Sequence, residues 1–125
     1  MQIGVPMEIK PQEYRVGMTP GGVRELVAAG HTVQVQTQSG ARIGLTDDRY
    51  RDAGAHVIET AEALFADCDL IVKVKEPQAQ ECRLLRSGQT LFTYLHLAAD
   101  PEQAKLLMTS GANCIAYETV TSPQG

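Results

Sequence analysis

The feature that most constrains the fold of this chain is a regular alternation of short β-rich runs with helical segments. Six runs are rich in apolar and β-branched residues, and we expect strands at 3–6, 32–37, 56–59, 69–77, 90–95 and 114–118. The intervals between them carry helix signals, namely caps such as Thr19, Thr46 and Asp100 and glycine stops such as Gly30 and Gly54. Because strands joined by helical crossovers run parallel, the sequence predicts an α/β fold.

The expected fold class is a doubly wound, mostly parallel α/β sheet with helices on both faces, of the Rossmann- or flavodoxin-like type. A length of 125 residues is enough for one such domain and too short for two. Only residues 119–125 follow the last expected strand, so no closing helix covers it. We therefore expect the domain to be incomplete at its C-terminus and to form part of something larger.

Charge and composition argue against several classes of function. A net charge of −4 disfavours nucleic-acid partners, which attract basic surfaces. No apolar segment approaches the roughly 18 residues that a membrane span needs, and the N-terminus lacks the regions of a secretory signal. The three cysteines, Cys68, Cys82 and Cys114, have no disulfide or zinc spacing. We expect them to be reduced, with Cys114 in the core, in a cytoplasmic protein without membrane or nucleic-acid partners.

Polar side chains that follow the expected strands are the candidates for chemistry. In an open parallel sheet, ligands bind beyond the carboxyl ends of the strands. Arg15 lies in the long loop after the first strand, and Lys75, His96 and Glu118 follow the fourth, fifth and sixth. A guanidinium, an ammonium, an imidazole and a carboxylate should therefore share one edge of the sheet.

The same rule excludes two histidines and keeps His96 and Arg15 as candidates. His31 and His56 stand where strands begin, which places them on the opposite edge. His96 can exchange a proton near neutral pH, since the reference pKa of histidine is about 6.5. Arg15 can bind a carboxylate through two hydrogen bonds. The alternatives stay open from pattern alone: a structural histidine, a solvated arginine, a surface lysine, and a helix-start anion at Glu118.

The usual phosphate-binding motifs are missing from the sequence. The first strand is followed by "GVPMEIK" instead of a G-x-G-x-x-G turn, and no G-x-x-x-x-G-K-[ST] motif occurs. We therefore expect no cofactor to bind this chain alone through the usual dinucleotide fingerprint, and no metal site.

Several stretches in fixed order resemble a known family. The stretches "IGVPMEIKPQEYRVGMTPGGVRELVAAGHTV", "VKVKEP", "LFTYLHLAADPE" and "IAYETV" are similar to the N-terminal, substrate-binding domain of NAD-dependent L-alanine dehydrogenases. The similarity runs essentially from Met1 to about Val120. The R-V-x-x-T-P and V-K-E-P elements are shared with the alpha subunit of proton-translocating transhydrogenase, whereas "FTYLHLA" and "IAYETV" favour the dehydrogenase branch.

The resemblance assigns roles to residues of this chain. It implies that Arg15 holds the carboxylate of pyruvate or alanine, that Lys75 contacts the substrate carbonyl and carboxylate, and that His96 is the general acid and base. It also implies supporting roles for the remaining matched positions, which are Tyr94, Glu13 and Glu118, the last as a polar residue or a metal neighbour. Met7 departs from the family, which usually has a lysine there.

The resemblance further implies reversible deamination of L-alanine to pyruvate and ammonia with NAD, by a protein that is a homo-oligomer at full length. Family members continue into a dinucleotide-binding domain, which residues 1–125 do not contain. We therefore expect residues 1–125 to form only the substrate-binding domain and to be inactive alone. Two alternatives are a non-catalytic module that binds small carboxylates or serves in assembly, and a fragment of a transhydrogenase alpha subunit.

Overall fold

The computed structural model describes residues 1–93 and 101–116. Three of the predicted site residues, Tyr94, His96 and Glu118, lie outside the described residues. The strands are β1 (Gln2–Val5), β2 (Thr32–Gln36), β3 (His56–Ile58), β4 (Leu70–Val72), β5 (Thr90–Thr93) and β6 (Asn113–Ala116). The helices are α1 (Pro20–Ala28), α2 (Asp47–Asp52), α3 (Ala61–Asp67), α4 (Ala79–Cys82) and α5 (Pro101–Ser110), with a short 3-10 helix η1 (Ala41–Ile43).

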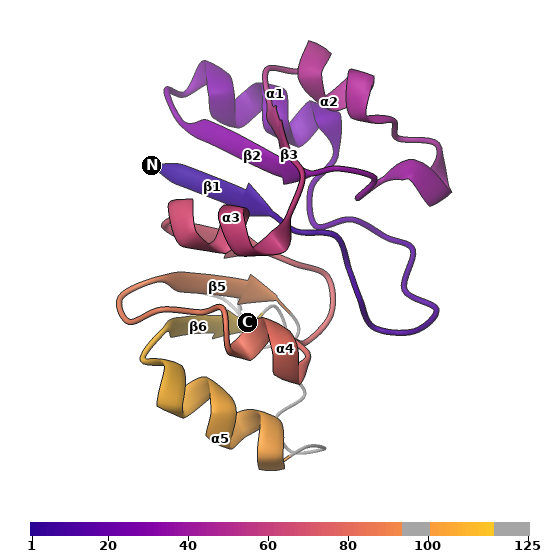
Figure 1. Cartoon of the computed structure of the whole chain (residues 1–125). Helices are drawn as coiled ribbons and strands as arrows, with labels where there is room; N and C mark the ends of the chain where they lie inside the picture. The colour runs from indigo at the N-terminus through magenta and orange to yellow at the C-terminus, as the bar shows by residue number, and fades with distance from the viewer. Residues whose placement is uncertain (94–100, 117–125) are drawn as a thin grey trace, which may run out of the picture.

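The strands form one parallel sheet in the order β3-β2-β1-β4-β5-β6 (Figure 1). Every strand pair is parallel, with Ile3 opposite Val33 on one side of β1 and opposite Leu70 on the other. This confirms the predicted doubly wound α/β class. The order reverses between β1 and β4, and this switch point is where the loops that follow the two strands part to leave a crevice.

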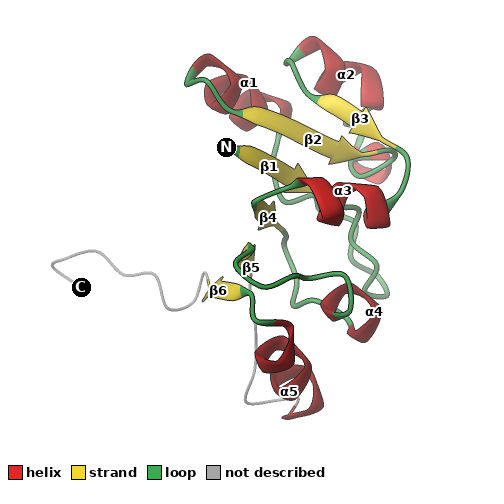
Figure 2. Ribbon diagram, turned by 60° about the vertical axis from the view of Figure 1, so that its left-hand side comes forward, coloured by secondary structure: helices red, strands yellow, loops and turns green. Residues whose placement is uncertain are grey.

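Helices cover both faces of the sheet, and each face has its own core. Val23 of α1 and Tyr50 of α2 pack with Val33 and Val35 on one face. On the other face, Leu64 and Phe65 of α3 join a cluster that Leu91 and Leu107 complete, and these residues come from β5 and α5. Figures 1 and 2 show α1 and α2 on one side of β1 and β2, and α3 on the other.

Threonine caps begin three of the helices, and the sequence analysis predicted two of them, Thr19 and Thr46. The predicted cap Asp100 lies outside the described residues. The side chains of Thr19, Thr46 and Thr60 accept hydrogen bonds from the backbone N–H groups at the starts of α1, α2 and α3. These bonds satisfy donors that have no partner within the helix. They fix where each helix begins and therefore how long the preceding loop is.

The structure differs from the sequence prediction at β4 and at the sheet edge. β4 ends at Val72, although the alternating "IVKVK" pattern predicted a strand to Pro77. The backbone leaves the sheet because Glu8 accepts the N–H groups of Val74 and Lys75. The expectation that Cys114 lies in the core is wrong, since it is exposed on the edge strand β6.

The edge of the sheet is open in the part of the chain that the structure describes. Ile115 on β6 is 46% exposed and Met108 on α5 is 83% exposed. The core cluster formed with α1 and α2 contains no residue of β5 or β6. None of the described helices is long and apolar enough to cross a membrane.

Candidate carboxylate-binding site

Two loops meet at the switch point and form a cavity. The loop after β1 leaves the sheet beside the segment after β4, because β1 and β4 are neighbours. The cavity has a volume of about 500 Å³. It is lined by Lys10, Pro11, Gln12, Glu13, Tyr14, Arg15 and Lys75. Two of the predicted site residues, Arg15 and Lys75, are thus brought together by two strands that are distant in sequence, since Gly4 lies opposite Ile71.

A tight turn shapes the first loop. The N–H of Glu13 donates to the carbonyl of Lys10 at 3.1 Å, so residues 10–13 form a β-turn. Pro11 occupies its second position, and Gln12 its third with a φ of 66°. A proline followed by a left-handed residue is typical of a type II turn. The turn reverses the chain and directs Glu13 back toward the sheet.

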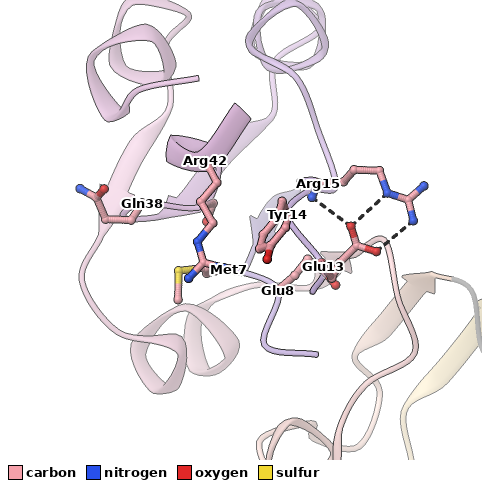
Figure 3. A pocket seen from close by; sticks show the side chains of 8 residues that line it. Met7, Glu8, Glu13, Tyr14, Arg15, Gln38 and Arg42 are labelled. Atoms are coloured by element: carbon pink, nitrogen blue, oxygen red, sulfur yellow. Dashed lines mark hydrogen bonds and ion pairs between the residues drawn. The ribbon is translucent and has the colours of Figure 1, made fainter. Parts of the chain in front are cut away.

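Glu13 holds the Arg15 guanidinium (Figure 3). Arg15 donates to the Glu13 carboxylate from Nε at 3.0 Å and from Nη2 at 2.9 Å, and its backbone N–H donates at 2.9 Å. The side chain of Glu13 is only 6% exposed, whereas that of Arg15 is 62% exposed. The hydrogen bonds from Arg15, and the charges of Arg15 and Lys75, lower the pKa of Glu13 against the opposing effect of burial. Glu13 therefore carries a negative charge at neutral pH.

A smaller cavity of about 50 Å³ borders the same loop on the side of η1. The Arg42 guanidinium lies 4.9 Å from the centre of the Tyr14 ring. Figure 3 shows Arg42 between Met7 and Tyr14. This cation–π contact fixes the Tyr14 ring and with it one wall next to Arg15.

Two contacts hold the end of the loop against the sheet. A Cβ added at Gly17 would lie 2.5 Å from the carbonyl oxygen of Val72, so only glycine allows the loop to approach β4 this closely. The buried Tyr50 hydroxyl donates to the carbonyl of Met18 at 2.7 Å. Together these contacts fix the backbone just after Arg15.

Hydrogen bonds to its backbone groups fix the position of Lys75. Its carbonyl accepts the hydroxyl of Thr93 at 2.6 Å, and its N–H donates to Glu8 at 3.1 Å. The next residue, Glu76, forms an ion pair with Lys10 of the first loop. The half-buried Lys75 side chain lines the large cavity.

A buried ionic cluster lies beneath the site, and the sequence did not predict it. The Lys73 ammonium lies 2.9 Å from Glu8 and 3.0 Å from Glu81, and all three side chains are almost completely buried. Burial raises the pKa of Glu81, and the Lys73 charge partly offsets that effect. The sequence offers one partial signal, two lysines in a run that was expected to form a single apolar strand, because a buried lysine requires an acidic partner. It does not show which lysine is buried or which acidic residues pair with it.

The segment after β1 lacks the geometry of the usual dinucleotide-binding turn. α1 begins only at Pro20, so no short glycine turn places a helix N-terminus at the end of β1, which ends at Val5. No group of three or more side chains suited to a metal ion occurs within residues 1–93 and 105–115, whose side chains the structure describes.

The geometry defines a class of protein: a doubly wound α/β domain with an arginine and a lysine facing one cavity at the switch point. Such a pair of cations suits a small carboxylate ligand. Comparisons with known proteins then narrow the class. The model of the alanine dehydrogenase/PNT N-terminal domain family matches residues 4–125.

Individual relatives agree with that match. The alanine dehydrogenase of Halomonas elongata is 54% identical over 125 residues, which are 100% of this chain and 34% of that protein. A solved L-alanine dehydrogenase superimposes with a TM-score of 0.95 at 51% identity, covering 99% of this chain and 34% of that one. The transhydrogenase of Sinorhizobium meliloti gives a TM-score of 0.88 at 27% identity, covering 97% and 37%.

This chain belongs to the alanine dehydrogenase/PNT N-terminal domain family. It spans about a third of the length of the curated relatives that it matches.

Proposed function

We propose that this chain is the substrate-binding domain of an alanine dehydrogenase and that the cavity at the switch point binds the carboxylate of L-alanine or pyruvate. The observation that carries this proposal is the convergence of Arg15 and Lys75 on one cavity. Arg15 would bind the carboxylate through paired N–H groups, and Lys75 would supply a second positive charge toward the carbonyl oxygen.

Glu13, Tyr94, His96 and Glu118 complete the proposed site. Glu13 supports Arg15 by fixing the direction of its guanidinium. His96 is proposed as the general acid and base because it follows β5, the neighbour of β4, and because a histidine can exchange protons near neutral pH. Tyr94 and Glu118 are proposed as supporting polar residues on the same ground of sequence position.

The proposed reaction is the reversible oxidative deamination of L-alanine to pyruvate and ammonia with NAD, in a cytoplasmic homo-oligomer. The residues of this chain would bind and orient the substrate and exchange its protons. NAD would be held by protein beyond these residues, since the turn after β1 does not suit it. The higher identity to alanine dehydrogenases than to the transhydrogenase, 51% against 27% among solved structures, supports this choice.

A chimera tests the proposal. Residues 1–125 would replace the matching segment of the Halomonas elongata alanine dehydrogenase, which is 54% identical. We expect NAD-dependent oxidation of L-alanine by the chimera, and none by the 125-residue chain alone. Loss of activity in a folded chimera, or activity of the chain alone, would contradict the proposed division of labour.

The same chimera tests the proposed acid and base. His96→Gln should lower kcat at least about a hundredfold, the range typical of general acid–base catalysis, while His31→Gln should leave it unchanged. His31 precedes β2 and therefore lies on the opposite edge of the sheet.

A further inference from the structure

The cluster of Glu8, Lys73 and Glu81 has no role in the function proposed so far. Glu8 lies in the loop after β1, Lys73 directly follows β4, and Glu81 lies in α4. The cluster therefore joins α4 to the two segments that line the cavity. Replacing such a cluster by apolar side chains of similar volume is often neutral or stabilising for a protein. Stability alone therefore gives a weak reason for an ionic cluster at this place.

The contacts of Glu8 point to a more specific role. Its Oε1 accepts from Lys73 Nζ at 2.9 Å and from the N–H of Lys75 at 3.1 Å. Its Oε2 accepts from the N–H of Val74 at 3.0 Å. One buried carboxylate thus binds three consecutive residues at the point where the chain leaves β4.

This arrangement decides where the Lys75 side chain lies. In a continued strand, Lys73 and Lys75 would project from the same face, because side chains alternate with a period of two. Instead Lys73 is buried at 1% exposure, while Lys75 lines the open cavity beside Arg15. Glu8 separates the two lysines by binding the ammonium of the first and the backbone of the second.

We propose that Glu8 is a positioning residue that places Lys75 in the substrate cavity. The inference rests on the proposed role of Lys75 in binding the substrate carboxylate. Lys73 neutralises the Glu8 carboxylate, and Glu81 completes the partners of Lys73 without touching the backbone of residues 74–75 in any described contact.

Two matched substitutions separate positioning from simple stability. Glu8→Gln and Glu81→Gln each remove one negative charge that faces Lys73. Only the first alters the acceptor for the Val74 and Lys75 N–H groups, because the amide nitrogen of glutamine is a donor. The probe is pyruvate, titrated into the 125-residue chain and followed by NMR chemical shifts.

We expect Glu8→Gln to weaken pyruvate binding about tenfold and Glu81→Gln to change it less than about twofold. In a Lys75→Ala background, Glu8→Gln should cause no further loss, because a residue that acts only through Lys75 has nothing left to position. Equal losses in the two glutamine variants, or a full additional loss in the Lys75→Ala background, would overturn the inference.

The failure of this inference differs from a failure of the proposed function. Unchanged pyruvate affinity in Lys75→Ala refutes the proposed role of Lys75 and the inference that rests on it, whereas a weakened Lys75→Ala with an additive Glu8→Gln refutes positioning alone. Should Glu8→Gln not fold, hydrogen exchange in the unchanged chain decides: the Lys75 N–H must be protected, and rapid exchange contradicts the inference.

Discussion

At the scale of single residues, the direction of the Arg15 guanidinium is set by a neighbour two positions away. Glu13 engages Nε and Nη2 of the guanidinium and also the backbone N–H of Arg15. The Glu13 carboxylate is buried, while the Arg15 side chain that it binds is largely exposed. Such an arrangement fixes the orientation of the guanidinium before a ligand binds.

Glu13→Gln gives a prediction whose sign separates positioning from plain electrostatics. Removing a negative charge beside Arg15 and Lys75 would strengthen anion binding if charge alone mattered. We expect the opposite: the affinity for pyruvate should fall three- to tenfold, which is a loss of about 1 kcal/mol of binding free energy. The reason is that glutamine cannot accept all three hydrogen bonds. NMR titration with pyruvate measures the affinity of the variant. Glu25→Gln, at an exposed position, is the control because it changes the net charge by the same amount. Tighter binding in Glu13→Gln would rule out the positioning role.

Tyr50 gives a prediction about alkaline stability. Burial raises the pKa of Tyr50 from 10.0 to about 12. The folded state keeps the phenolic proton where the unfolded chain has released it, so this contribution is complete below about pH 10 and is lost as the pH rises toward 12. At about 1.4 kcal/mol per pKa unit, the loss reaches about 2–3 kcal/mol.

The comparison with Tyr50→Phe isolates this effect. At pH 8 the variant should be about 1 kcal/mol less stable, because the Met18 carbonyl loses its donor. Near pH 11.5 the difference should vanish or reverse, since phenylalanine has no proton to lose. Urea unfolding at the two pH values provides the free energies, and a difference that stays constant would show that the Tyr50 proton is not linked to folding.

The sequence selected two residues that line the cavity and did not select the ionic cluster beside it, for a physical reason. Arg15 and Lys75 follow strands, so the rule that ligands bind at the carboxyl edge of a parallel sheet makes them candidates. Glu8, Lys73 and Glu81 were not recognised as partners, because a contact between residues 8, 73 and 81 depends on the loop paths. Only the buried environment of Lys73 forces an ion-pair partner, and burial is a property of the fold.

At the scale of elements, the sequence predicted where capped helices begin but not where β4 ends. A cap acts on groups within three residues, so local sequence contains the whole signal. The end of β4 is set by Glu8, which is 65 positions or more away in sequence from Lys73, Val74 and Lys75. The local pattern "IVKVK" cannot reveal that a carboxylate so distant in sequence binds the backbone N–H groups of Val74 and Lys75.

The loop that carries Arg15 gives the prediction at this scale. Gly17→Ala places a Cβ against the Val72 carbonyl, whereas a Cβ at Gly21 meets nothing nearer than the Thr19 hydroxyl, at 3.8 Å, apart from its chain neighbours and its own helix backbone. We expect Gly17→Ala to destabilise the fold by about 1–3 kcal/mol and to weaken pyruvate binding. Gly21→Ala, in α1, should stabilise it by about 0.5–1 kcal/mol, because alanine favours the helix.

Thermal and urea unfolding of the two glycine variants measure these changes. Similar effects of the two substitutions would show that the loop does not depend on its close approach to β4. Pyruvate titration of Gly17→Ala then tells whether the displaced loop also moves Arg15.

At the scale of the whole molecule, the alternation of strands and helices predicted a parallel sheet but left the strand order undetermined. Crossover connections fix that neighbouring strands run parallel, and they are satisfied both by a 3-2-1-4-5-6 order and by an order that contains 2-1-3-4-5. The observed order makes β1 and β4 neighbours. This adjacency brings the loop with Arg15 against the segment with Lys75, and so the site is a property of the topology.

The measurement that tests the central claim most directly is a pyruvate titration of the chain and of its Arg15→Lys variant. A guanidinium can bind a carboxylate through two N–H groups in fixed geometry, whereas an ammonium keeps the charge and loses that geometry. We predict saturable binding by the unchanged chain and at least about tenfold weaker binding by Arg15→Lys. Equal affinities of the two proteins would contradict a carboxylate site built on Arg15 at the β1–β4 switch point.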